Sequence, residues 1–268
     1  TLRFPQTSLR SPRTSFVSRI GALLRPTRTP VFTDNRQHIK CNALAKLKVA
    51  GKLDDFAYAK DAPKVKIPRM LFDSRLPDWF QLHKKNTGNH TLDAILDAGF
   101  QGVASANFPR ESNEEGVGDA LDELRRQGFK RSDVFIMTRY YPKGLQMMDS
   151  TPYDRQAPAP MQVRQSFINS QRNLNTERFD AFIWDATAGV IVRDEDLQAW
   201  EEIENLYLEG RTKLIGLGGF PLHQYKEIYE HAEIKPMIIA DTVHAHLGWN
   251  REVREWCKEN GIVYMVKC

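Results

Sequence analysis

The 268-residue sequence lacks three features that would assign it to specialised classes. It has no run of roughly 18 consecutive apolar residues, so a membrane-spanning protein is not expected. Its three cysteines, Cys41, Cys257 and Cys268, are too few and too scattered for a disulfide framework or a zinc site, and they fit a reducing compartment best. No glycine-rich turn follows an early apolar segment, which argues against a dinucleotide-binding doubly wound fold.

Acidic residues are absent from residues 1–33, where six Arg and ten Ser or Thr are interspersed with Phe, Leu and Pro. Within this stretch, residues 15–25 can form a short amphipathic helix. This composition is typical of an organelle transit peptide, and Ile39–Ala43 resembles a plastid processing site. We therefore expect residues 1–43 to be a transit peptide for the plastid stroma, with the mitochondrion as the alternative. A disordered basic tail is the other interpretation.

Positive charge is concentrated at the start of the chain. Residues 1–40 hold seven Arg and one Lys against one acid, whereas the remaining 228 residues hold 30 bases and 33 acids. This slightly acidic remainder gives no clustered basic face, so nucleic acid is not an expected partner. We expect residues 44–62 to be a linker and residues 63–268 to be the folded domain.

Short apolar segments alternate with helical patterns through that domain, which indicates βα units and a parallel sheet. Start and stop signals support several helices, such as Asp194 with Glu195 at one start and Gly210 at its end. The expected strands are Lys66–Phe72, Gly99–Ala106, Asp133–Tyr140, Phe179–Asp185, Lys213–Gly218, Met237–Val243 and Ile262–Lys267. The expected helices are 90–98, 114–128, 160–174, 194–210, 222–232 and 250–259.

Seven strands and six helices fit either a doubly wound sheet or most of a (β/α)₈ barrel. The segment Gly216-Leu217-Gly218-Gly219 comes late and lacks dinucleotide-binding spacing, so it reads as a tight turn after a strand. We therefore predict a TIM-type barrel with about seven of its eight βα units in this chain. Because an unclosed barrel exposes two strand edges, we expect a domain that is incomplete at its C-terminal side.

Several motifs in one collinear order across residues 66–268 make the domain resemble an aldo-keto reductase. The family's first helix and second strand are resembled by Thr91–Val103, and its next helix by Asn113–Gly118. The segment before the catalytic His is resembled by Val163–Ser166, Asn173-Leu174 and Arg178–Asp180. The fourth helix and fifth strand are resembled by Ala199–Glu201 through Ile215-Gly216 and Phe220.

The resemblance implies a (β/α)₈ barrel that reduces carbonyls with NADPH and without a metal. In that chemistry a Tyr donates a proton while hydride leaves the nicotinamide, and Lys, His and Asp assist. None of these four catalytic residues is retained. The family's Asp, Tyr, Lys and His positions are occupied by Ala104, a residue at or near Pro109, Arg139 and Asp185, respectively.

The nicotinamide contacts implied by the resemblance are also replaced. The family's Ser-Asn pair falls on Gly218 and Gly219, its Gln on Thr242, and its ring-stacking aromatic on Lys267. Each lost hydrogen bond or aromatic contact weakens binding by ~0.5–1.5 kcal/mol. NADPH is thus the cofactor that the resemblance implies, and these residues predict that it binds weakly.

The ends of the expected strands also carry side chains that could support other chemistry. Arg139 and Asp185 lie on adjacent expected strands and would form a buried ion pair in the vacated pocket. His244 and His246 are two apart on an expected extended segment and, with Asp185 or Asp241, make a conceivable metal site. Tyr140 and Tyr141 have two interpretations. They are either ordinary packing aromatics at the end of a strand, or one of them is a displaced proton donor.

These substitutions leave two functional hypotheses. The first is a catalytically inactive aldo-keto reductase homologue that acts as a structural or regulatory subunit of an unknown protein partner in an organelle. The second is an active NADPH-dependent oxidoreductase that reduces an aldehyde or ketone with an atypical proton donor.

Overall fold

The computed structural model describes residues 65–75, 84–146, 150–185 and 191–267, all within one compact unit. The expectations for the transit peptide at 1–43 and the linker at 44–62 lie outside the described residues. Among the described segments, no helix combines the length and apolar character that crossing a membrane requires.

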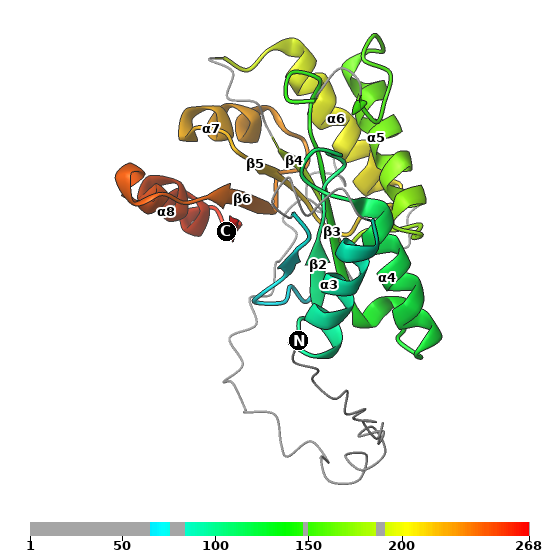
Figure 1. Ribbon diagram of the computed structural model, residues 1–268. Coiled ribbons are helices and arrows are strands. Elements are labelled where there is room, and N and C mark those ends of the chain that lie inside the picture. Colours follow the sequence, from blue (N-terminus) through cyan, green and yellow to red (C-terminus); the bar gives the residue numbers. More distant parts are fainter. Residues whose placement is uncertain (1–64, 76–83, 147–149, 186–190, 268) are drawn as a thin grey trace, which may run out of the picture. The chain divides into compact units, whose positions relative to one another are not determined.

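Seven strands form one parallel sheet in which neighbours in sequence are neighbours in space. The expected seven-unit barrel-type architecture is confirmed, and helices alternate with the strands along the chain (Figure 1). The strands are β1 (Phe72–Asp73), β2 (Gly102–Ala104), β3 (Phe135–Tyr140), β4 (Ala181–Asp185), β5 (Ile215–Gly218), β6 (Ile238–Thr242) and β7 (Val263–Lys267).

Six α-helices connect these strands, as a parallel sheet requires for its crossovers. They are α3 (Lys84–Leu96), α4 (Glu114–Arg126), α5 (Ala159–Asn173), α6 (Asp194–Leu208), α7 (Leu222–His231) and α8 (Arg251–Glu259). The N-terminal signals act as expected at α4, where Asn113 accepts a hydrogen bond from the backbone of Gly116 at 2.9 Å.

The expected boundaries differ from the structure most at the first unit. The first strand was expected over Lys66–Phe72, but β1 contains only Phe72 and Asp73. Pro68 has no N–H to donate to a ladder, which disfavours pairing over the preceding stretch. The first helix begins at Lys84 rather than at residue 90, and its Gly88 packs closely against the backbone of Gly116 in α4.

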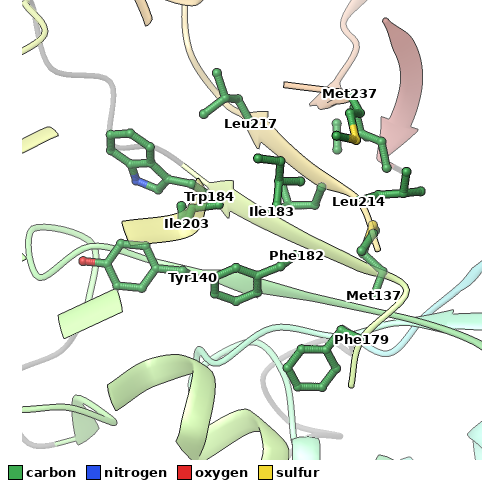
Figure 2. Close-up of a cluster of buried hydrophobic side chains, with 14 of the residues drawn as sticks. Met137, Tyr140, Phe179, Phe182, Ile183, Trp184, Ile203, Leu214, Leu217 and Met237 are labelled. Atoms are coloured by element: carbon green, nitrogen blue, oxygen red, sulfur yellow. The ribbon is translucent and has the colours of Figure 1, made fainter. Parts of the chain in front are cut away.

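Aromatic and aliphatic side chains fill the layer between the sheet and its helices. Phe167 of α5 lies edge-on to Phe179 and Phe182, with ring centroids 4.8 and 4.9 Å apart. Figure 2 shows Trp184 of β4 beside Ile203 of α6, on the helix side of the strand. This layer fixes the strands from outside and leaves the opposite face of the sheet to the polar residues described next.

The two ends of the sheet are its first and last strands. In the part of the chain that the structure describes, β1 pairs only with β2 and β7 only with β6. The sheet nevertheless curls, because side chains from strands well apart in the order meet over its inner face, as the ion pairs below show.

Candidate functional site

Three of the four positions aligned with the family tetrad lie at or near the carboxyl ends of strands. Ala104 ends β2, Arg139 lies near the end of β3, and Asp185 ends β4. Pro109 instead lies in an exposed turn after β2. In a βα barrel this end of the sheet carries the chemistry, so the substituted residues occupy the functional face.

Lys267 and Asp185 form an ion pair across the inner face. The ammonium of Lys267 donates hydrogen bonds to both carboxylate oxygens of Asp185, at 2.7 and 2.8 Å. Both side chains are buried, with Lys267 only 8% exposed. Because β5 and β6 lie between β4 and β7, the pair connects two strands that share no backbone ladder.

Arg139 lies between two carboxylates but bonds closely to neither. Its Nη2 is 3.4 Å from an oxygen of Asp73 on β1, and its Nε is 3.9 Å from Asp185. Arg75 binds Asp73 more tightly, with Nε and Nη2 both donating to the carboxylate. The expected Arg139–Asp185 ion pair is therefore present but long, and Lys267 is the cation that hydrogen-bonds Asp185.

The hydroxyl of Tyr141 completes the surroundings of Asp185. It donates a hydrogen bond to the second carboxylate oxygen at 3.1 Å, and the Tyr141 ring stacks on Phe108 with centroids 4.8 Å apart. Tyr140 lies in the helix-side layer and contacts the ring of Tyr153. Of the two tyrosines considered as displaced donors, only Tyr141 contacts a residue of this network.

Burial and charge shift the pKa values within the network. Burial would raise the pKa of Asp73, but the charge of Arg139 and the hydrogen bonds from Arg75 outweigh it and hold this pKa below its ordinary value. Burial lowers the pKa of Lys267 despite the attraction of Asp185, and the charge of Arg139 lowers it further. Burial, followed by the negative charge of Asp185, raises the pKa of Tyr141 above its ordinary value.

Gly218 of β5 lies beside Asp185 of β4, where a side chain would be crowded. The two residues pair in the β4–β5 register, and a Cβ on Gly218 would lie 3.3 Å from Asp185 Oδ1. It would also lie only 2.4 Å from the carbonyl oxygen of Ala240, so the backbone itself excludes a side chain here. A side chain at 218 would therefore strain the β5–β6 ladder and crowd the Asp185 carboxylate.

The remaining positions aligned with nicotinamide contacts bind other parts of the protein. The N–H of Gly219 donates to Asp241 at 2.7 Å, and Tyr225 donates to the same carboxylate oxygen at 2.6 Å. Thr242 is exposed at the end of β6, where its carbonyl accepts from Asn250. Asp241 thus packs toward α7, away from Lys267 on the inner face.

The conceivable metal site at His244 and His246 rested on an extended backbone, and this geometric premise was wrong. Residues Ala245–Asn250 form a 3₁₀ helix, so the backbone after His244 is not an extended strand. Within the described ranges, no group of three or more His, Cys, Asp or Glu is placed to hold a metal ion.

Sequence reasoning missed Asp73 and Arg75, and it did not place Lys267 against Asp185. Asp73 ends β1, so a polar residue directly after the first apolar segment was the available signal. The boundary expected for that strand, one residue too early, placed Asp73 in a loop. No sequence signal pairs residues 185 and 267, because their contact depends on how strongly the sheet curls.

Comparisons with known proteins place this chain in a family. The chain matches the model of the aldo/keto reductase family over residues 79–267. It is 26% identical to the glyoxal reductase of Bacillus subtilis over 185 residues, which cover 68% of this chain and 58% of that relative. The chain thus spans less than two thirds of the length of this relative.

Solved structures show the same fold at lower identity. An aldo/keto reductase from Brucella melitensis matches with a TM-score of 0.60 and 20% identity, over 76% of this chain and 69% of that one. The Bombyx mori aldo-keto reductase in complex with NADP matches with a TM-score of 0.59 and 18% identity, over 76% and 63%. From the family match over most of its folded domain, this chain belongs to the aldo/keto reductase family.

Proposed function

We propose that this protein is an aldo/keto reductase homologue that does not reduce carbonyls by the family's route and acts as a structural or regulatory subunit for a protein partner in an organelle. One observation carries the proposal. The Lys267–Asp185 ion pair joins the position of the nicotinamide-stacking aromatic to the position of the catalytic His. A buried pair of this kind fills the site where the cofactor ring and the substrate carbonyl would meet.

The position of the proton donor adds support. Ala104 and the exposed Pro109 carry no acidic proton, and Arg139 is not the lysine that assists the family's proton donor. Asp185 brings a negative charge to the place where an oxyanion would form, which disfavours that intermediate electrostatically. The chemistry of these four residues therefore opposes proton transfer to a reducing carbonyl.

NADPH is the cofactor that the family resemblance implies, and the residues present do not fit its nicotinamide end. Gly218 offers no side chain, the Gly219 N–H is already bonded to Asp241, and the amine of Lys267 is bonded to Asp185. The contacts needed to hold the ring are used within the protein itself. No reaction step through this cofactor is proposed.

The organelle assignment rests on residues 1–43 alone, and the proposal favours the plastid stroma over the mitochondrion. A fusion of these residues to a fluorescent protein tests it, with Arg-to-Glu changes in the same segment as the control. Retention of the fusion in the cytosol would remove the organelle from the proposal. Purification from that compartment should then recover a stoichiometric partner.

The proposed loss of reduction is tested by NADPH titration of the full-length protein, followed by fluorescence. We expect no saturable binding at micromolar NADPH and no NADPH oxidation with aldehydes. Micromolar binding together with carbonyl-dependent oxidation would overturn the proposal.

The alternative function is an NADPH-dependent oxidoreductase that reduces an aldehyde or ketone with an atypical donor. The hydrogen bond from Tyr141 to Asp185 favours it, since this hydroxyl lies within the network at the strand ends. If reduction is observed, Tyr141→Phe should abolish it, whereas Tyr140→Phe, which alters only the helix-side layer, should not. If neither variant lost activity, Tyr141 would have no support as the proton donor.

A further inference from the structure

We propose that Lys267 is a carbonyl-reactive amine and that this site captures small 2-oxo acids as imines on its Nζ. The proposal goes beyond the function proposed above and does not depend on it, since imine formation requires neither NADPH nor the family tetrad. It rests on the neighbours of Lys267 at the strand ends.

The first support is the arrangement of a nucleophile, a base and a residue that orients the base. Lys267 Nζ lies 2.7 and 2.8 Å from the two oxygens of Asp185, and the Tyr141 hydroxyl donates to Asp185 at 3.1 Å. An amine within hydrogen-bond reach of a base that a third group orients is the arrangement found around activated nucleophiles.

The second support is the environment of the amine. Lys267 is 8% exposed, and burial lowers its pKa, as does the nearby charge of Arg139. Desolvation and a neighbouring cation are the two means by which proteins favour the neutral, nucleophilic form of lysine. Lys267 nevertheless lies on a strand at the end of the described sheet, next to Val266, which is 51% exposed.

The third support is Arg139, which indicates the substrate class. Its side chain is 1% exposed, yet among the described residues its Nε and Nη1 have no hydrogen-bond partner within bonding distance. Unpaired buried donors cost free energy unless a ligand or water meets them. A carboxylate is the group that a guanidinium binds best, and a 2-oxo acid carries it next to the carbonyl.

The step balances without an oxidant or a further reactant. Asp185 accepts one proton from the Lys267 ammonium, and the nitrogen lone pair forms a C–N bond to the carbonyl carbon while the C=O π electrons move to oxygen. After proton transfer from nitrogen to that oxygen, Asp185 returns its proton to the hydroxyl. The C–O bond then breaks, and water leaves a protonated imine.

Reductive trapping tests the proposal on the full chain without NADPH. The protein is incubated with pyruvate and cyanoborohydride, and the modified peptide is mapped by mass spectrometry. We expect modification at Lys267 in preference to all other lysines. Lys267→Arg, which keeps the charge opposite Asp185, should lose it, and circular dichroism checks that this variant folds. Lys213→Arg is the matched control, because Lys213 also pairs with a buried aspartate, Asp180, at 2.7 Å.

Methyl pyruvate separates recognition of the carboxylate from reactivity of the carbonyl. Because its ester cannot form a charged pair with Arg139, we expect it to label Lys267 at least about ten-fold less than pyruvate. Equal labelling by the two probes would overturn the 2-oxo acid class. Absence of labelling at Lys267 in the wild-type protein, or labelling spread evenly over exposed lysines, would overturn the reactive amine and leave a purely structural ion pair.

Discussion

Lys267 and Asp185 are 82 residues apart in sequence and have two strands between them in the sheet, yet two hydrogen bonds join them. On the other side of the network, Arg139 of β3 reaches Asp73 of β1 past Ala104, whose side chain is a single methyl group. These buried contacts bridge strands that have no common ladder. They hold the curl of a sheet whose first and last strands do not pair with each other.

Removal of one partner of the buried ion pair should be strongly destabilising. Lys267→Met leaves Asp185 without its closest cation in a buried position, so we expect the free energy of unfolding to fall by about 3–5 kcal/mol. Urea denaturation measures the change. The exposed Lys84 pairs with Asp119 on the surface, and its replacement by Met should cost at most ~1 kcal/mol.

A paired replacement separates the charge penalty from lost packing. The double variant Lys267→Met with Asp185→Leu removes both charges together, so it should recover most of the stability lost in the single variant. A double variant as unstable as the single one would mean that packing, not an unpaired charge, explains the loss.

A side chain at residue 218 should weaken the sheet and the ion pair together. Gly218→Ala brings a Cβ to 2.4 Å from the carbonyl oxygen of Ala240 and to 3.3 Å from Asp185. We expect a loss of about 1–3 kcal/mol in the free energy of unfolding, typical of forced overpacking. Thermal denaturation followed by circular dichroism checks this, and a change below about 0.5 kcal/mol would contradict the close approach.

Stability should fall as pH rises toward neutrality because of Glu114. Its carboxyl is buried between α4, β3 and α5, accepts a hydrogen bond from Thr138 at 2.6 Å, and has its pKa raised by burial from 4.5 to about 7. Between these values the folded state holds a proton that the unfolded state has released. The contribution of this group is therefore full below pH 4.5 and is lost as pH rises through about 7.

Glu114→Gln should remove this pH dependence, which amounts to roughly 3 kcal/mol across that window. The variant should match the wild type near pH 5 and exceed it in stability near pH 8. Glu204, whose pKa burial also raises to about 7, retains its own part of the slope. Glu115→Gln, on the exposed side of α4, serves as the control. Parallel denaturation curves for Glu114→Gln and the wild type at both pH values would contradict the assignment.

Restoration of the four tetrad residues should not restore reduction. Ala104→Asp, Pro109→Tyr, Arg139→Lys and Asp185→His together return the family's catalytic groups while leaving Gly218, Gly219, Thr242 and Lys267 unchanged. Because the nicotinamide contacts are still missing, NADPH oxidation with aldehydes should remain near background. A vigorous reductase from these four changes would show that the cofactor contacts had been judged wrongly.

The sequence alone was sufficient for the family and the order of the units. Short apolar segments that alternate with helical patterns indicate which segments are strands. Several motifs in one order identify the family without any knowledge of contacts. The expected β4 and β7 differ from the structure only by one or two residues at their starts. Local patterns of this kind depend on neighbours along the chain, and the sequence records them directly.

Only the tertiary structure decided what the substituted residues do. Arg139 was expected to pair with Asp185, its neighbour in strand order, and it does so only at 3.9 Å, whereas Lys267 of β7 hydrogen-bonds that carboxylate. The choice depends on the curl of the sheet and on the reach of a lysine across two strands. These distances arise only when all seven strands pack together, because charges far apart in sequence become partners only where the fold removes them from water.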